Sequence, residues 1–256
     1  MTDADPVRTR RAGLARALSK LGYCSRSRAA ELVRAGRVRL NGKIQCDSET
    51  PVALGRDRIE VDGQPARAAR KQYWMLNKPR GVVTTASDEK GRATVYDLLP
   101  RDLPWLAPVG RLDKASEGLL LLTNDSEWAA RITAPETHLD KTYHVQVNRL
   151  CNSADLQRIT RGVRVESGEM LRAKSASVLR HGERNSWLEI LLDEGKNRQI
   201  RRMLEAMGIE TLRLVRVAIG PLQLGGVAKG ESRALSVQEK NPLDSAMRSR
   251  GRDSKT

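Results

Sequence analysis

The sequence predicts an α+β protein, in which a small α/β module precedes a larger domain built on a mixed, largely antiparallel sheet. Apolar residues recur at helical spacing near the N-terminus and alternate at strand spacing further along the chain. Gly, Pro and Asn-Gly turns separate these segments. With 256 residues, the chain is long enough for one large domain or two smaller ones. Because Phe is absent and aromatic residues make up 3%, the core must be mainly aliphatic.

The charge balance predicts a polyanionic partner. Lys and Arg total 46 against 31 Asp and Glu, a net charge of +15. The first 80 residues contribute +10 of this, with 18 basic and 8 acidic residues. Three cysteines at unrelated spacings are typical of a reduced cytoplasmic protein, and the scattered histidines predict no metal site. We expect no membrane partner, because no apolar run approaches the roughly 18 residues that cross a bilayer.

The N-terminal part divides into an arm, a module and a linker. Residues 1–12 are polar and unpatterned, which predicts a disordered basic arm. Within residues 13–63, helical spacing from Leu14 stops at Gly22, and Ser25 is placed to cap a second helix. A hairpin around an Asn-Gly turn and one further strand complete the module. Residues 64–72 are polar and predict a linker.

The larger domain is predicted over residues 73–235 and is followed by a flexible basic tail, 236–256. The expected strands lie at 73–76, 82–85, 119–122, 141–147 and 187–192, and the expected helices at 154–160 and 195–208. In the strand at 141–147, alternation places Tyr143, Val145 and Val147 on one face.

The segment from Gly110 to Asp125 is the strongest candidate for a reactive site. Its four consecutive leucines, bounded by turn-forming residues, are typical of a fully buried strand. The charged residues before them then lie in a loop at the end of that strand, where reactive groups are often placed. Asp113, flanked by Arg111 and Lys114, would stay ionised as a nucleophile or base. Composition alone favours a solvated charge cluster instead.

The module at 13–63 contains SRSRAAE at 25–31, GRV at 36–38 and NGK at 41–43. Through these motifs it resembles the S4 RNA-binding domain. The resemblance implies that the capped helix and the following loop place cations along an RNA backbone, through Arg26, Arg28, Arg37 and Lys43. Such phosphate contacts add affinity but little sequence information. The alternative is that some of these side chains only increase solubility.

Four ordered motifs in the larger domain resemble those of the RsuA/RluB-type ribosomal RNA pseudouridine synthases. They are NKPRG at 77–81, GRLD at 110–113 with GLLLLTND at 118–125, KTY at 141–143, and EGKNRQIRRM at 194–203. With the S4-like module, the resemblance covers residues 13 to about 235. Ser116 stands where the family commonly has Thr, and Ser126 where a Gly often follows Asn-Asp. Both departures bear on local backbone shape only.

The resemblance implies an isomerase that breaks the N1–C1′ bond of a uridine, rotates the uracil and reattaches it through C5. Asp113 would be the catalytic carboxylate, either attacking C1′ or taking a proton from C2′. The sequence leaves both roles open. The reaction transfers neither electrons nor a group from another molecule, so we expect no cofactor.

The resemblance also assigns substrate-binding residues around the catalytic carboxylate. Tyr143 would stack on the target uracil, and Arg201 would pair with Asp113 and lower its pKa. Because the uridine must be flipped out of folded RNA, Arg111 would fill the gap that it leaves. Lys78 and Arg80, presented on a Pro/Gly turn, would contact the RNA as further cations.

Two other functions compete with this interpretation. A non-catalytic RNA-binding ribosome-assembly factor would not need Asp113, Tyr143 and Arg201 together. An RNA hydrolase acting on the glycosidic bond would normally need a second carboxylate, for which Glu117 is the only nearby candidate. We therefore expect a monomeric enzyme that acts on ribosomal RNA or a pre-ribosomal particle. The motif at 194–203 resembles the large-subunit branch more than the small-subunit branch.

Overall fold

The structure is a computed structural model that describes residues 11–86 and 91–249. Most of the predicted basic arm, and the last seven residues of the predicted tail, lie outside these ranges. The chain divides into two compact units. One contains residues up to Gln72 with 101–107 and 123–126, and the other contains 73–100, 108–122 and the chain from Glu127 onward.

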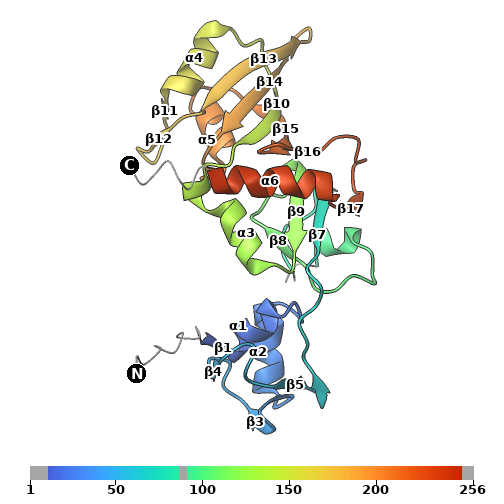
Figure 1. Ribbon diagram of the computed structural model, residues 1–256. Coiled ribbons are helices and arrows are strands. Elements are labelled where there is room, and N and C mark those ends of the chain that lie inside the picture. Colours follow the sequence, from blue (N-terminus) through green and yellow to red (C-terminus); the bar gives the residue numbers. More distant parts are fainter. Residues whose placement is uncertain (1–10, 87–90, 250–256) are drawn as a thin grey trace, which may run out of the picture. The chain divides into compact units, whose positions relative to one another are not determined.

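The first unit packs two helices on short strands, as the sequence predicts (Figure 1). Its helices are α1 (Leu14–Lys20) and α2 (Arg26–Arg34), and the Ser25 hydroxyl accepts a hydrogen bond from the Arg28 amide at 3.1 Å. The strands are β1 (Ala12–Gly13), β2 (Val38–Leu40), β3 (Lys43–Gln45), β4 (Pro51–Val52), β5 (Ile59–Val61) and β6 (Gln64–Pro65). Strand β1 pairs with β4, and the others form a sheet in the order β3-β2-β5-β6.

The predicted linker begins too early in the sequence. Gln64 pairs with Val61 across the β5–β6 hairpin, and Ala66 packs against the aliphatic core of the first unit. That core is formed by the apolar faces of α1 and α2 together with Val38, Ile59 and Val61. The composition of residues 64–66 did not indicate a strand. An edge strand such as β6 depends on backbone pairing more than on apolar side chains.

The second unit is built on a mixed sheet in the order β13-β14-β10-β15-β9-β7-β17. Its strands are β7 (Tyr73–Lys78), β8 (Ala107–Val109), β9 (Glu117–Thr123), β10 (Lys141–Val147), β13 (Ser175–His181), β14 (Ser186–Leu192), β15 (Thr211–Ile219), β16 (Leu222–Gln223) and β17 (Ser232–Ala234). Strands β15 and β9 are parallel, whereas β13–β14, β14–β10, β10–β15 and β17–β7 are antiparallel. The predicted α+β class with a mixed, largely antiparallel sheet is confirmed.

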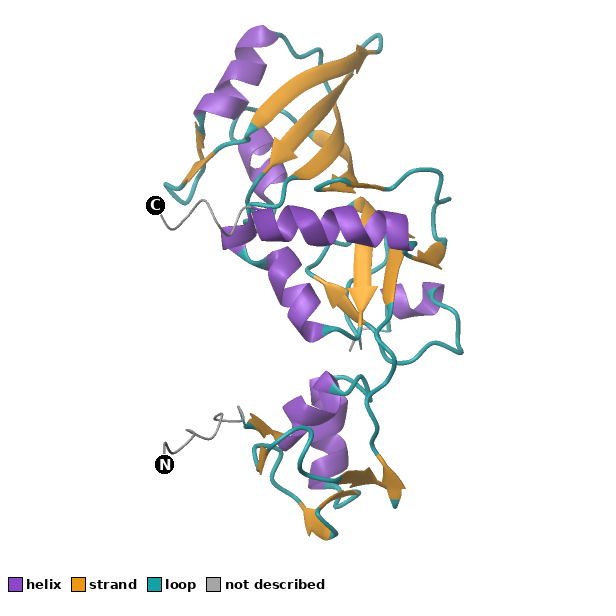
Figure 2. Cartoon of the chain, in the orientation of Figure 1, coloured by secondary structure: helices purple, strands orange, loops and turns teal. Residues whose placement is uncertain are grey.

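Helices cover this sheet and complete two aliphatic cores. They are α3 (Ser126–Thr133), α4 (Ser153–Arg161), α5 (Gln199–Glu205) and α6 (Val237–Ser249), with short 3-10 helices η1 (Val95–Leu98) and η2 (Pro135–Thr137) and a small hairpin of β11 (Val163–Arg164) and β12 (Met170–Leu171). Helices α4 and α5 lie along one face of β10, β13, β14 and β15 (Figure 2). Val145 and Val147 are fully buried on that face and Tyr143 packs against it, as predicted. None of the described helices is long and apolar enough to cross a membrane.

Strand β9 is the most deeply buried element of the second unit. All seven of its residues are buried, and Leu119 to Leu122 have no exposed surface, as the sequence predicts. At Gly118 the strand passes very close to β15: a Cβ added there would lie 2.2 Å from the Arg216 carbonyl oxygen. Gly118 also has φ +100°, which a residue with a side chain rarely adopts. Both constraints require glycine at the point where the Asp113 loop enters the sheet.

Two predicted boundaries in the second unit are wrong. Residues 82–85 form no strand and make only one bridge, between Val83 and Thr94. The predicted helix at 195–208 is shorter, because α5 begins at Gln199 and Arg198 has left-handed backbone angles. The residues before Gln199 form a loop held by side-chain hydrogen bonds, and apolar spacing could not reveal this.

The predicted flexible tail is also wrong over residues 237–249, which form α6. Leu243 has no exposed surface and Met247 is 6% exposed, and both belong to a core with Trp128, Leu119 and Leu121. The Trp128 Nε1–H donates to Asp244 Oδ1 at 2.7 Å. Leu243, Ala246 and Met247 of α6 pack on the core, but they are diluted by polar residues, so composition alone resembled a tail.

Replacing Leu243 by Ala is expected to lower the free energy of unfolding of the second unit by about 2–5 kcal/mol, because the substitution leaves a cavity in an aliphatic core. Val237→Ala in the same helix is the matched control, since Val237 is 67% exposed. That control should change stability by no more than about 0.5 kcal/mol. Urea unfolding followed by circular dichroism measures both variants, and equally small losses would mean that α6 is not packed on the core.

Candidate active site

The loop from Leu112 to Ser116, which leads into β9, has every backbone carbonyl hydrogen-bonded. Lys78 Nζ donates to Asp113 O at 3.1 Å and to Ser116 O at 2.9 Å, and Asp113 O also accepts from the Ser116 amide at 2.9 Å. Thr84 Oγ1 donates to Leu112 O at 2.8 Å, and the Gly81 amide donates to Lys114 O at 2.8 Å. Arg201 Nη2 donates to Ala115 O at 3.0 Å. Four of these six hydrogen bonds come from Lys78, the last residue of β7, and from the segment that follows it. The loop backbone is therefore fixed, while the Asp113 side chain stays 31% exposed.

Lys78 lies at the centre of this hydrogen-bond network and is fully buried. Its ammonium group donates to the carbonyls of Pro79, Asp113 and Ser116, so its three protons match three acceptors. Burial lowers the pKa of Lys78 to about 8, and the nearby negative charges of Asp113 and Glu117 oppose that shift. The prediction that Lys78 contacts RNA is wrong, because the side chain has no exposed surface. A buried lysine is rare, which is why the sequence did not suggest it.

The cation that faces Asp113 is Arg198. Its Nη1 lies 4.0 Å from Asp113 Oδ2, and the Arg198 side chain is 49% exposed. Arg111 and Lys114, which flank Asp113 in the sequence, are both exposed. Within residues 11–86 and 91–249, no ion pair joins either of them to Asp113. The ion pair of Asp113 in this structure therefore comes from Arg198 and not from its neighbours in the sequence.

Arg201 does not form the predicted pair with Asp113. Its Nη2 donates to Ala115 O at 3.0 Å, and its Nη1 reaches Thr211 O at 3.4 Å. Burial and the neighbouring Arg198 lower the pKa of Arg201, Asp113 opposes this shift, and Arg80 adds to it. The guanidinium thus lies in a cluster with Arg80, Arg198 and Asp113, but two backbone carbonyls hold it. In this structure Arg201 therefore contacts the backbone of the Asp113 loop and not the Asp113 carboxylate.

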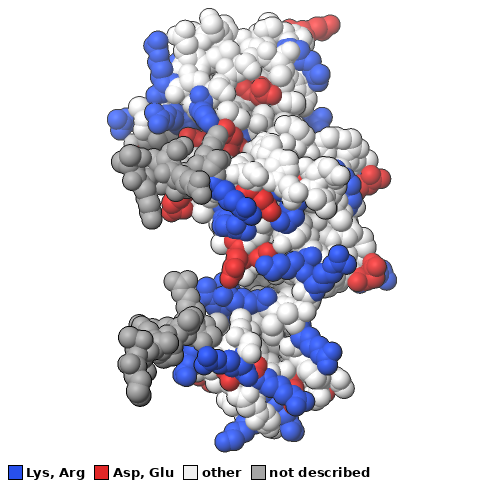
Figure 3. Space-filling view, in the orientation of Figure 1, with Lys and Arg blue, Asp and Glu red and all other residues white. Residues whose placement is uncertain are grey.

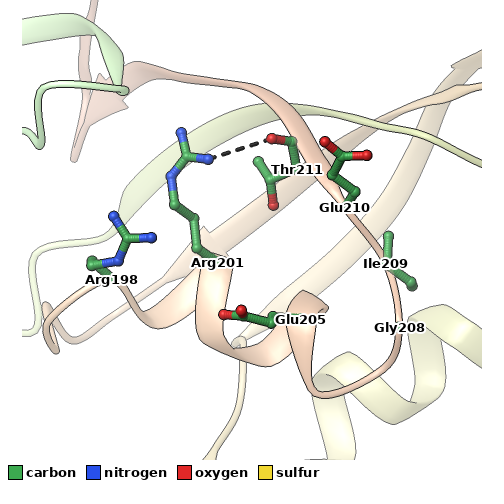
Figure 4. A pocket seen from close by; sticks show the side chains of 7 residues that line it. All are labelled: Arg198, Arg201, Glu205, Gly208, Ile209, Glu210 and Thr211. Carbon is green, nitrogen blue, oxygen red and sulfur yellow. Dashed lines mark hydrogen bonds between the residues drawn. The ribbon is translucent and has the colours of Figure 1, made fainter.

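Arg198 and Arg201 also line an open pocket of about 410 Å³ (Figure 4). Its lining residues are Arg198, Arg201, Glu205, Gly208, Ile209, Glu210 and Thr211. Figure 4 shows both arginine side chains leaving the start of α5 on one side, with Arg201 bonded to the Thr211 carbonyl. Arg201 Nε and Thr211 Oγ1 are buried here without a hydrogen-bond partner in the described part of the protein. These two atoms have no accessible surface, so a ligand in the pocket could bond to them only if the surrounding side chains moved.

Gln199 fixes the loop that carries Arg198. Its amide is 2% exposed, donates to Glu194 Oε1 at 2.6 Å and Arg172 O at 2.9 Å, and accepts from the Lys196 amide at 3.2 Å. Arg198 itself has φ 48° and ψ 31°, a left-handed conformation that is uncommon outside glycine. Neither feature was predicted from the sequence. The polar EGKNRQ run ahead of the first apolar residue was the available signal.

Glu117 is a buried carboxylate beside the loop, with its side chain 4% exposed. It pairs with Arg213 at 3.1 Å and with Lys229 at 2.5 Å. Burial would raise the pKa of Glu117, but the hydrogen bonds from Arg213 and Lys229 outweigh burial and hold it below its usual range. Glu117 is therefore ionised and fully engaged at neutral pH.

Tyr143 and Arg80 are the remaining predicted residues of the second unit. Tyr143 is half-buried in β10 opposite Arg216 of β15, and Arg216 lies opposite Gly118 of β9. Tyr143 is thus two strands away from the strand that follows Asp113. Arg80 is exposed, and its charge reaches Arg201. In the described ranges, no group of three or more His, Cys, Asp or Glu side chains could hold a metal ion.

The four predicted RNA-binding residues of the first unit are all exposed. Arg28 pairs with Glu31 at 2.9 Å, and Arg37 makes a two-pronged pair with Asp62. Arg26 and Lys43 take part in no ion pair with any residue that the structure describes. On the face in Figure 3, Lys and Arg side chains gather over the first unit. Its basic surface thus includes cations that intramolecular carboxylates do not neutralise.

Comparison with known proteins identifies the family of both parts. Residues 72–206 match the model of the RNA pseudouridylate synthase family, and residues 13–57 match the S4 domain. A ribosomal large subunit pseudouridine synthase B of Bacillus subtilis is 37% identical over 227 residues, covering 88% of this chain and 93% of that protein. An uncharacterised RNA pseudouridine synthase of Aquifex aeolicus is 38% identical, covering 87% and 89%.

A solved structure supports the same relationship. The crystal structure of a pseudouridylate synthase superposes with a TM-score of 0.63 at 29% identity, covering 91% of this chain and 99% of that one. The resemblance inferred from the four sequence motifs and the S4-like module is therefore confirmed. The chain belongs to the RNA pseudouridylate synthase family and carries an N-terminal S4 domain.

Proposed function

We propose that this pseudouridine synthase isomerises a uridine of ribosomal RNA, in the large subunit, with Asp113 as its catalytic carboxylate. The observation that carries the proposal is the fixed loop from Leu112 to Ser116, which presents one partly exposed carboxylate beside Arg80, Arg198 and Arg201. The relatives named as large-subunit synthases support the choice of RNA.

The reaction needs an ionised carboxylate that reaches the sugar of a flipped nucleotide. Fixed loop carbonyls reduce the freedom of Asp113 before substrate arrives, which favours a productive approach to C1′ or to the C2′ proton. Tyr143 is proposed to stack on the uracil, and Arg111 to occupy the gap in the RNA helix. Arg201 would hold the loop through the Ala115 carbonyl.

The S4 module is proposed to supply non-specific affinity for RNA. Arg26 and Lys43 are its best candidates for phosphate contacts, because Arg28 and Arg37 are paired with carboxylates. The module at 13–63 would bind RNA while the domain from residue 73 carries the chemistry, extended past 235 to include α6. The protein would act in the cytoplasm as a monomer, on free ribosomal RNA or a pre-ribosomal particle.

The environment of Glu117 argues against the hydrolase alternative. A glycoside hydrolase needs a general acid that holds a proton near neutral pH, usually through a raised pKa. Two cations instead keep the pKa of Glu117 low. Glu117 is therefore suited to anchoring β9 to β15 and the Lys229 segment, and not to protonating a leaving group.

Asp113→Asn is expected to abolish conversion of uridine while leaving RNA affinity within about twofold, because it removes the ionisable oxygen and keeps the side-chain volume. Ribosomal RNA is incubated with the enzyme, and pseudouridine is mapped by selective chemical labelling of the modified base. Asp102→Asn, at an exposed aspartate outside the site, is the matched control and should retain activity. Substantial turnover by the Asp113→Asn variant would refute the assignment.

The isomerisation rate is expected to fall as pH rises through about 8, the pKa of Lys78, because a neutral amine can donate only two of the three hydrogen bonds.

The free energy of unfolding should instead rise with pH over the same range. Unfolded Lys78 keeps its proton up to about 10.4, so between these values the unfolded state binds more protons and the lysine's contribution to stability rises with pH. Single-turnover rates and thermal unfolding across this range measure both effects. The same alkaline fall in a Lys78→Met variant would assign it to another group.

A further inference from the structure

We propose that Arg198 binds the backbone phosphate of the nucleotide whose uridine is isomerised, and that it rests beside Asp113 only while RNA is absent. This inference rests on the proposed function and adds a contact on the substrate. It is carried by the contrast between Arg198 and its neighbour Arg201, by the backbone at Arg198, and by the charge around Asp113.

The two arginines differ in what holds them. Arg201 is bound by the carbonyls of Ala115 and Thr211. Arg198 is half exposed, and the only ion pair it makes among the described residues is the contact with Asp113 at 4.0 Å. That distance is too long for a hydrogen bond, which needs about 2.7–3.2 Å between N and O. Arg198 can therefore leave Asp113 at little cost, whereas Arg201 cannot leave its carbonyls without exposing unpaired groups.

The backbone at Arg198 is held in an uncommon conformation that directs this side chain. A left-handed φ of 48° is disfavoured for a residue with a long side chain. The buried Gln199 amide keeps the loop in place through three hydrogen bonds, to Lys196, Glu194 and Arg172. Strain of this kind, maintained by the surrounding structure, is concentrated at functional sites. Here it keeps the guanidinium at the mouth of the site and outside α5.

The charges around Asp113 exceed what one carboxylate can neutralise. Burial lowers the pKa of Arg201, Arg198 and Arg80 lie close enough to lower it further, and the carboxylate that opposes them is Asp113. Glu205 and Glu210 also line the pocket but are not among the charges that shift this pKa. A second anion is therefore needed to balance the cluster when water is displaced. The substrate supplies one, because the phosphates of a nucleotide are joined directly to the ribose that Asp113 must reach. The planar guanidinium of Arg198 can bind two phosphate oxygens at once.

A matched pair of variants tests this assignment against a role in RNA attraction by charge alone. In Arg198→Gln the proposed contact is lost. Arg202→Gln is the control, four residues further along the chain. The Arg202 guanidinium already binds Glu169 Oε2 and Ser167 Oγ, both at 2.9 Å. Both variants lose one positive charge, so the overall field changes equally. Only the first should lose an RNA phosphate contact.

The measurement is the dissociation constant for ribosomal RNA as a function of salt concentration. Arg198→Gln is expected to weaken binding about tenfold and to reduce the slope of log affinity against log salt by about 0.7–0.9, the value for one phosphate contact. Arg202→Gln should leave the slope unchanged, and Arg198→Lys should restore it. Equal slopes for wild type and Arg198→Gln would overturn the proposal.

A second arm locates the phosphate on an oligoribonucleotide that spans the mapped uridine. A neutral methylphosphonate replaces the phosphate on its 5′ or its 3′ side, and dissociation constants are measured for wild type and Arg198→Gln. At one of the two positions, the loss of affinity caused by the methylphosphonate and the loss caused by Arg198→Gln should not add, because both changes remove the same contact. Additive losses at both positions would overturn the proposal. The salt slope needs no turnover, so failure of wild type to isomerise would count against the proposed function alone.

Discussion

The buried ammonium group of Lys78 is the interaction on which the active-site geometry depends. Lys78 ends β7, and its three protons bind the carbonyls of Pro79, Asp113 and Ser116. A buried charge without a carboxylate partner is costly, and only a complete set of acceptors makes it tolerable. The loop therefore supplies the acceptors that Lys78 needs, and Lys78 supplies the donor that fixes the loop. Neither arrangement is stable without the other.

The sheet makes this mutual dependence possible by bringing distant motifs together. Strands β7 and β9 are neighbours, so the segment after Lys78 reaches the loop before Glu117. On the other side of β9, Gly118 permits the close approach of β15, and Glu117 is held there by Arg213. Arg201 then adds its own bond to the carbonyl of Ala115. Four separate stretches of the chain thus contribute contacts that fix the loop of a single carboxylate. This explains why the motifs occur together in the sequence.

The elements that follow from periodicity and turn chemistry were predicted correctly from the sequence. The prediction failed where a side chain lies in an environment that is unusual for its type. The leucines of β9 and the Ser25 cap follow from pattern alone, and the loop position of Asp113 follows from that strand. Lys78 was assigned to RNA because lysine is normally exposed. Arg198 and Arg201 could not be distinguished, because which of two nearby arginines faces Asp113 depends on where α5 begins. That boundary is set by the buried Gln199 amide, a tertiary contact that no local pattern records.

Hydrogen–deuterium exchange of the Asp113 loop in a Lys78→Met variant tests the central dependence most directly, because it reports backbone order without requiring activity. Loss of the ammonium group should remove the lysine donor from the carbonyl of Ser116 and leave the carbonyl of Asp113 with only the Ser116 amide, so the amides of Ser116 and Gly81 should exchange at least about tenfold faster. Amides of α2 in the first unit should be unaffected. Unchanged exchange at Ser116 and Gly81 in a folded variant would contradict the account and show that the loop holds its shape without Lys78.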